Sequence, residues 1–300
     1  MISSFKVLSH FLYVVFGIIL LSAFVGLFSN GIQLDFTVFL KNVLHIIKSL
    51  IFPDNLIILG PTNQEYSIFL NFWDYYIYSL TIFLSALFIA MICGLFITYL
   101  TVLLPQKINN LVSKFVSLLE SLPDLFIIMF IQFSVILYFK QSGHLLFPVA
   151  GSSQNQTYFL PVVTLALIPS FMIFRINLHL VSDEWNKSYV ELARSKGFNK
   201  TEIFFFHVLR NIAPSIFSHS KTIVLYLLSS MVIFEKLFNI YGIFTFITSY
   251  PNPNVIAFTL ILFFVPVFLI YAIITSFIEK YTGQRLEWWF CVYIKKTSIK

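Results

Sequence analysis

The side chains able to form specific ionic contacts gather in one polar segment, Ser182 to Pro214, which we call the polar island. The stretches on either side of it are almost uncharged, so the island must lie in water between two apolar segments. Mixed charges of this kind suit recognition of a partner surface. The charged residues of the island are Asp183, Glu184, Lys187, Glu191, Arg194, Lys196, Lys200, Glu202 and Arg210.

Patterns that would support catalysis by this chain are missing from its sequence. It has no GxxxxGK[ST] phosphate loop, no HExxH zinc motif and no Cys-x-x-Cys pair. ATP hydrolysis, if it drives this protein, therefore belongs to another subunit. We expect no catalytic residue, no metal site and no cofactor.

Isolated ionisable residues near the apolar segments have structural interpretations. Arg175 is close enough to the inner end of its span to reach water, so an anchoring role is favoured over substrate binding. His179 and His207 are interpreted as boundary and docking residues. Glu235, near the outer end of its span, is expected to reach the surface water.

Two short helices around Gly197 are expected to position the charges of the island. Ser182, followed by two acidic residues, is typical of a helix start, and the first helix is predicted to run to about Lys196. Gly197 suits the left-handed conformation that ends a helix. Asn199 and Glu202 have capping-box spacing and predict the start of the second helix.

Composition places the rest of the chain in a membrane. Hydrophobic residues make up 58% of the 300 residues and charged residues 11%, and the mean hydropathy is +0.88. Soluble domains are about 25% charged. A helix needs roughly 20 residues to cross a bilayer. The sequence therefore predicts an all-α integral membrane protein with about six spans, near residues 11–28, 79–102, 125–139, 160–180, 222–234 and 255–277.

The distribution of Lys and Arg predicts the orientation of the spans. Basic residues are frequent in the polar island and after the last span, and Lys107 and Lys114 lie between the second and third spans. These segments are expected in the cytoplasm together with both termini. The net charge of +6 then follows from topology and does not indicate nucleic-acid binding.

Four regions follow from this reading. They are an N-terminal anchor helix (1–28), an extracytoplasmic segment (29–78), a core of five spans (79–280) whose loop covers about 182–214, and a basic cytoplasmic tail (281–300). Within the second region, helical spacing predicts an amphipathic helix from Phe36 to Leu50 that Asp35 caps. This helix would pack at the bilayer surface, or it would serve as a docking surface for a partner protein.

The polar island resembles the cytoplasmic EAA loop of permease subunits of ABC importers. Glu191, Leu192, Ala193 and then Gly197 follow the pattern of that loop. The stretches YVELARSKG from Tyr189 and HVLRN from His207 are closest to the permeases of oligopeptide, dipeptide and nickel uptake systems. The resemblance runs from about Ser79 to Arg285. Departures are Leu192 in place of the middle alanine, Glu191 where this branch often has arginine, and an early Pro214.

The resemblance implies a type I ABC importer permease fold and a set of partners. These are a second homologous permease subunit, two cytoplasmic ABC ATPase subunits, an extracytoplasmic substrate-binding protein and the lipid bilayer. The cargo would be a peptide or a small solute such as a nickel chelate. The residues implied to couple the chain to the ATPase are Tyr189, Glu191, Ala193, Arg194, Lys196, Gly197, His207 and Arg210, with Ala193 and Gly197 allowing close approach.

Two other classes of protein stay open at this point. A stand-alone secondary transporter or channel would need its own coupling ions and often broken helices near mid-membrane. A degenerate permease without transport activity is also compatible, because the departures at Glu191, Leu192 and Pro214 all lie in the coupling loop. A membrane-embedded enzyme would need a reactive pair within a span, and the sequence shows no such spacing.

Overall fold

The structure, a computed structural model, describes residues 4–28, 35–52, 57–59, 65–152 and 155–282. These residues are almost entirely helical, as predicted, and they form two compact units, one made of 1–53 and 252–300 and the other of 54–251. The predicted basic tail lies outside the described residues except for its first two positions.

The first unit contains the first and last long helices of the chain and the amphipathic helix. These are α1 (Ser4–Val25), the short η1 (Gly26–Phe28), α2 (Phe36–Ile51) and α11 (Pro253–Thr282). Phe11 of α1 stacks on Phe264 of α11, and Ile46 of α2 is fully buried against Ile19 and Ala257. Buried apolar area of this kind is what holds the helices of the unit together.

Helix α2 confirms the predicted amphipathic element and its cap. The Asp35 carboxylate accepts a hydrogen bond from the Thr37 backbone N–H at 2.8 Å, and this bond holds the pKa of Asp35 below its usual range. Phe39, Val43 and Leu50 pack against the rest of the unit. Phe36 and Leu44 are exposed, so part of the predicted apolar face is available to lipid.

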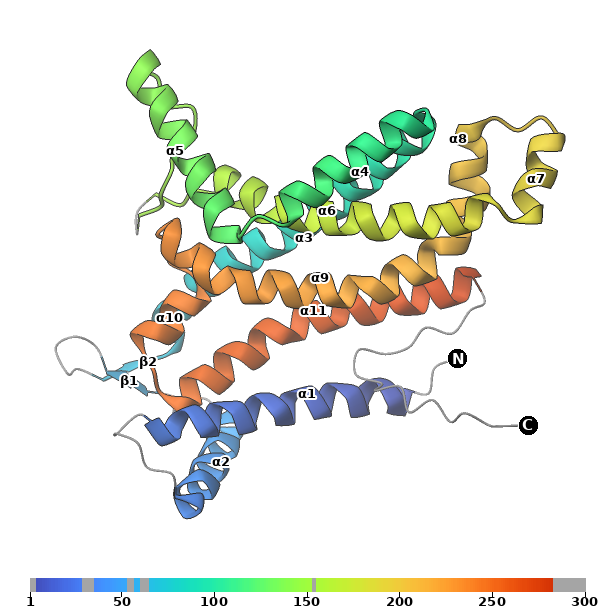
Figure 1. The fold of residues 1–300 in the computed structure, drawn as a ribbon. Coiled ribbons are helices and arrows are strands. Elements are labelled where there is room, and N and C mark those ends of the chain that lie inside the picture. Colours follow the sequence, from blue (N-terminus) through green and yellow to red (C-terminus); the bar gives the residue numbers. More distant parts are fainter. Residues whose placement is uncertain (1–3, 29–34, 53–56, 60–64, 153–154, 283–300) are drawn as a thin grey trace. The chain divides into compact units, whose positions relative to one another are not determined.

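The second unit is built on three long helices that pack along one another, α3 (Phe69–Leu103), α6 (Phe159–Trp185) and α9 (Leu209–Leu237) (Figure 1). The other helices are α4 (Gln106–Glu120), α5 (Asp124–Ser142), α7 (Ser188–Ser195), α8 (Lys200–Glu202), the π-helical η3 (Ile203–Val208) and α10 (Ile243–Ser249). An unpredicted antiparallel pair, β1 (Ile57–Leu59) and β2 (Glu65–Ser67), places Ile58 opposite Tyr66.

Within the part of the chain that the structure describes, six helical segments are long and apolar enough to cross a membrane, in agreement with the predicted number. Their ends differ from the apolar runs. The second predicted span belongs to a helix that begins earlier, at Phe69, and the fifth belongs to a helical run from Lys200 to Leu237. Hydropathy underestimates the lengths of both helices, because polar residues continue them beyond the apolar part.

The predicted third span lies within α5, and a separate helix, α4, precedes it. Helix α4 ends at Glu120, Ser121 to Pro123 interrupt the chain, and α5 begins at Asp124. Proline has no backbone N–H to donate to the preceding turn, and it disfavours helical conformation in the residue before it. The break brings two carboxylates, Glu120 and Asp124, against helix α6.

Candidate functional site

The polar island forms two helical pieces joined at Gly197, as expected. Figure 1 shows α7 beside α8 at the end of the unit where α6 finishes and α9 begins. Gly197 has a φ of +88°, and the N–H groups of Gly197 and Phe198 donate to the carbonyls of Arg194 and Ala193 at 3.0 and 3.2 Å. These bonds make the glycine-terminated C-cap that was predicted, which requires a residue free to adopt positive φ.

The predicted start of the first island helix is wrong. Ser182, Asp183 and Glu184 continue α6, which ends at Trp185, and α7 begins only at Ser188. Lys187 precedes α7 in an extended conformation. Helix α6 continues past the apolar run because Val181 and Trp185 pack into a hydrophobic cluster inside the island, which offsets the local preference of Ser182 for a cap.

The predicted capping box is confirmed. The Asn199 Oδ1 accepts from the Glu202 backbone N–H, and the Asn199 backbone N–H donates to the Glu202 carboxylate, both at 2.9 Å. The helix that starts there is not a separate short element, because α8, η3 and α9 follow one another without interruption to Leu237. Pro214 therefore lies inside a helix and not at the exit of the loop.

A hydrophobic cluster fixes the island helices to each other and to the spans. Its fully buried members include Val190, Ala193, Phe204 and Val208, and Tyr99 of α3 packs against it. Ala193 is 4% exposed, so its small side chain permits close packing inside the island. The island is therefore a packed extension of the membrane helices.

Tyr189 makes a contact within the island that was not predicted. Its hydroxyl donates to the Glu184 carboxylate, which Lys187 also contacts. Burial and the neighbouring carboxylate raise the pKa of Tyr189 to about 12. The tyrosine thus stays protonated at physiological pH and ties α7 to the end of α6.

The other predicted coupling residues lie at the surface of the island. Glu191, Arg194, Lys196, Gly197 and Arg210 are exposed. The Arg194 guanidinium lies 5.4 Å from the centre of the Trp185 ring, in a cation–π arrangement. The half-buried His207 ring meets the Phe198 ring edge to face at 5.5 Å. Both contacts restrict the orientation of side chains that face outward.

Large apolar side chains are exposed among these charges. Leu192 is 57% exposed, Phe198 44% and Phe206 71%. We call these three residues the apolar face of the island. The sequence reading took Leu192 as a departure from the loop pattern, and it did not identify Phe198 or Phe206. Exposed apolar groups rimmed by charge are typical of a protein-binding surface.

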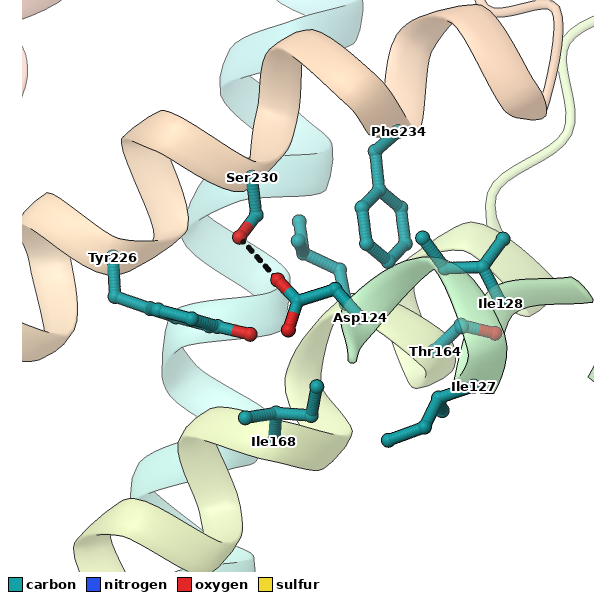
Figure 2. A pocket seen from close by; sticks show the side chains of 9 residues that line it. Asp124, Ile127, Ile128, Thr164, Ile168, Tyr226, Ser230 and Phe234 are labelled. Carbon is teal, nitrogen blue, oxygen red and sulfur yellow. Dashed lines mark hydrogen bonds between the residues drawn. The ribbon is translucent and has the colours of Figure 1, made fainter. Parts of the chain in front are cut away.

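A small pocket in the second unit, which we call the membrane pocket, contains polar groups from three helices. Asp124 of α5 faces Tyr226 and Ser230 of α9, and the Ser230 hydroxyl donates to the Asp124 carboxylate at 3.0 Å (Figure 2). Thr164 of α6 is buried at its wall. Apolar side chains complete the lining, namely Ile127, Ile128, Leu165, Ile168 and Phe234.

Sequence reasoning missed this pocket because Asp124 borders an apolar run and was not counted as part of a span. The Pro123–Asp124 pair after a polar amphipathic stretch was the available signal, since it predicts a break and a new helix start.

Arg175 forms an ion pair with Glu120, with nitrogen and oxygen 3.0 Å apart. Its guanidinium remains largely exposed at 63%, so it is compatible with the predicted anchor, but its partner on α4 was not foreseen. His179 approaches Asp183 at 3.8 Å. Among the described residues, no group of three His, Cys, Asp or Glu side chains could hold a metal ion.

The expectation that Glu235 reaches surface water is wrong. Glu235 is 1% exposed, and its carboxylate accepts from the Ser79 hydroxyl at 2.6 Å and from the Thr245 backbone N–H at 2.8 Å. Helix α10 folds back over the end of α9 and covers the carboxylate. A Cβ atom on Gly242 would lie 2.2 Å from both the Glu235 carboxylate and the Ser79 hydroxyl, so this packing requires glycine.

Comparison with known proteins gives three findings. The family model described as "Binding-protein-dependent transport system inner membrane component" matches residues 86–282, about two thirds of the chain. The dipeptide transport system permease protein DppB of Lactococcus lactis subsp. cremoris is 25% identical over 146 residues, which cover 47% of this chain and 48% of that protein. DppB of Haemophilus influenzae is 30% identical over 97 residues, which cover 32% and 29%.

Proposed function

This chain belongs to the family of binding-protein-dependent transport system inner membrane components, and from this membership we propose that it is the permease subunit of an ATP-driven dipeptide importer. Both curated relatives carry dipeptide transport in their names, which favours dipeptides over nickel chelates as cargo. The matches cover about half of one relative and less of the other, so the cargo is part of the proposal.

The apolar face of the island is the observation that carries this proposal. Leu192, Phe198 and Phe206 are exposed in a segment whose charges require water. Covering such side chains with a partner surface is favourable, at roughly 25 cal/mol per Å² of apolar area. We propose that a separate cytoplasmic ATPase covers them and that Glu191, Arg194, Lys196 and Arg210 make the charged contacts around them.

Within this proposal, Ala193 and Tyr189 keep the island rigid from inside, and Gly197 and His207 set its turn. A rigid island transmits motion, because α7 follows the end of α6 after two residues and α8 continues into α9. Closure of two ATPase subunits on ATP would move two such islands. The attached helices α6 and α9 would then tilt and switch the pathway between outward and inward access.

The orientation and the remaining partners belong to the same proposal. The basic residues Lys107 and Lys114 lie on α4, and the polar island is rich in charge, which supports a cytoplasmic position for both and for the two termini. A second homologous permease would complete the pathway. The segment 29–78 would face the substrate-binding protein, with residues 1–28 as an anchor.

One observation favours a second candidate function, a stand-alone secondary transporter. The break between α4 and α5 places Asp124 beside two other spans, and broken helices with polar side chains are typical of ion-coupled transporters. Such a transporter would depend on an ion gradient and would need no ATPase.

The two candidates differ in their energy source. We expect cells that lose this chain to lose uptake of labelled dialanine, and cells that regain it to recover uptake that continues when an uncoupler collapses the ion gradients but ATP is maintained. Uptake that stops with the gradients while ATP persists would support the secondary transporter. Unchanged uptake in cells without the chain would contradict dipeptide import.

A further inference from the structure

The membrane pocket contains an acidic side chain that helix packing alone does not explain. Asp124 is the first residue of α5, a position where a carboxylate can interact with the N–H groups of its own helix. Its carboxylate instead points to another helix, where it accepts from Ser230 and faces the Tyr226 hydroxyl (Figure 2). The side chain is thus arranged toward the pocket.

The position of the pocket makes this carboxylate costly. Thr164 and Ile168 lie within the α6 span, and Tyr226 and Ser230 lie within the span that ends at Leu237. An ionisable group between membrane spans is expensive, and apolar side chains would join the same helices without that cost. A charged group that persists at such a place is expected to serve a ligand or a pathway.

Glu120, the last residue of α4 before the break, provides the contrast. It has a basic partner, since the Arg175 guanidinium lies 3.0 Å away. The partners that the structure gives Asp124 are hydroxyl groups, which orient a carboxylate but do not neutralise it. Asp124 is therefore prepared to receive a positive charge.

The size of the pocket limits what that charge can be. The space beside Asp124 holds about one water-sized group, and the walls around it are isoleucine, leucine and phenylalanine. A primary ammonium group has this size and three N–H donors. A guanidinium is larger and planar, so a primary ammonium matches a space of this size better.

We propose that the membrane pocket binds a primary ammonium group with Asp124 as its counter-ion, and that this group is the amino terminus of a peptide in transit. The Ser230 and Tyr226 hydroxyls position the carboxylate for the ammonium group, and the rest of the peptide stays outside the small pocket. This inference rests on the proposed function, because a dipeptide importer supplies such an ammonium. Phosphatidylethanolamine offers the same chemical group, so the test must separate the two sources.

The experiment uses the whole importer, this chain with its co-purified partners, in vesicles of phosphatidylcholine and phosphatidylglycerol, which lack a primary ammonium. Uptake of dialanine is compared with uptake of lactoyl-alanine, which has a hydroxyl in place of the ammonium. The variants are Asp124→Asn, which keeps the shape, and Asp124→Glu, which keeps the charge. Asp74→Asn, which removes an exposed carboxylate of the same unit, is the matched control.

We expect Asp124→Asn to lower the ratio of dialanine to lactoyl-alanine uptake by roughly tenfold or more, as for the loss of a hydrogen-bonded charge pair. Asp124→Glu and Asp74→Asn should keep the ratio within about threefold of wild type. An unchanged ratio in Asp124→Asn overturns the ammonium site. Equal loss of both substrates, or loss in Asp124→Glu with activity in Asp124→Asn, shows a structural role and also overturns it.

The outcomes for the two proposals are distinguishable. A wild-type importer that takes up neither compound contradicts the proposed function, and the ammonium site falls with it. Normal dialanine uptake by Asp124→Asn contradicts the ammonium site and leaves the proposed function unaffected. If addition of phosphatidylethanolamine competes with dialanine in wild type, the lipid is the occupant. If Asp124→Asn does not reach the membrane, Tyr226→Phe replaces it, with a several-fold fall in the ratio expected and an unchanged ratio contradicting the site.

Discussion

At the scale of single residues, Gly197 shows how far local chemistry can be predicted. A glycine after a predicted helix and before a capping box indicated a left-handed residue, and its φ is +88°. The outcome was predictable because only the glycine and its immediate neighbours determine it. The packing of Ala193 and Tyr189 inside the island was not predicted, because the loop pattern does not reveal which side of a helix is buried.

Replacing Gly197 by Leu should reduce dipeptide uptake at least about tenfold while the protein still reaches the membrane. A Cβ atom disfavours positive φ by roughly 1–2 kcal/mol, so the turn and the apolar face would shift. Gly143→Leu is the matched control, since Gly143 also has positive φ, at 72°, with open space around it. Normal dipeptide uptake by Gly197→Leu would contradict a specific role of this turn. An equal loss of uptake in Gly197→Leu and Gly143→Leu would contradict it as well.

Glu235 shows where residue-level reasoning fails. Its distance along the span predicted contact with water, but a later segment, α10, folds over it, and sequence separation hides such a contact. Polar groups that are buried this way need partners, and Ser79, Thr245 and the glycine at 242 supply them or make room for them.

Glu235→Leu should lower the free energy of unfolding by about 1–3 kcal/mol, because the Ser79 hydroxyl and the Thr245 N–H would lose their acceptor. Thermal unfolding of the purified chain in mild detergent measures this effect. Glu235→Gln, which keeps one acceptor oxygen, should be milder, and Gly242→Ala should also destabilise through the contact at 2.2 Å. Wild-type stability in Glu235→Leu would show that the carboxylate is not needed for packing.

At the scale of elements, hydropathy located the six membrane segments but not their ends or breaks. Helix α6 extends through Ser182 to Glu184 because Trp185 and Val181 pack in the island cluster, and that packing is invisible in a local pattern. The break between α4 and α5 depends on Pro123 and on polar contacts with α6 and α9. Capping boxes, by contrast, depend on four consecutive residues and were predicted correctly.

Asn199→Ala should destabilise the start of the long helix by about 1 kcal/mol, because the Glu202 backbone N–H loses the Asn199 Oδ1 as its acceptor. Faster hydrogen exchange of the backbone amides from Lys200 to Glu202 would report this fraying. Asn186→Ala, which removes an exposed asparagine outside the capping box, is the control. Equal hydrogen-exchange rates in the two variants would mean that the capping box does not stabilise the start of this helix.

Placing a charge on the apolar face should weaken the contact with the ATPase. We expect Phe206→Asp to reduce uptake strongly, since burying an unpaired carboxylate costs several kcal/mol. Leu145→Asp is the control, because Leu145 is 53% exposed in a segment distant in sequence from the island. If both variants transport equally well, the apolar face is not a docking surface.

At the scale of the whole molecule, the class of protein followed from composition and from one loop, and the family match agrees with both. The cargo could not follow in the same way, because the residues that line a pathway come from helices far apart in the sequence. Asp124, Thr164 and Ser230 meet only in the folded unit. The hairpin of β1 and β2 was likewise missed, since it has only three residues in each strand.

The most direct measurement is purification of the tagged chain from mild detergent, followed by identification of the proteins that accompany it. The account predicts that an ATPase and a second permease accompany wild type and Leu145→Asp, whereas Phe206→Asp and Gly197→Leu keep the permease and lose the ATPase. A wild-type chain that is purified alone, with full dipeptide uptake in the same cells, would contradict the proposal that a separate ATPase drives it through the polar island.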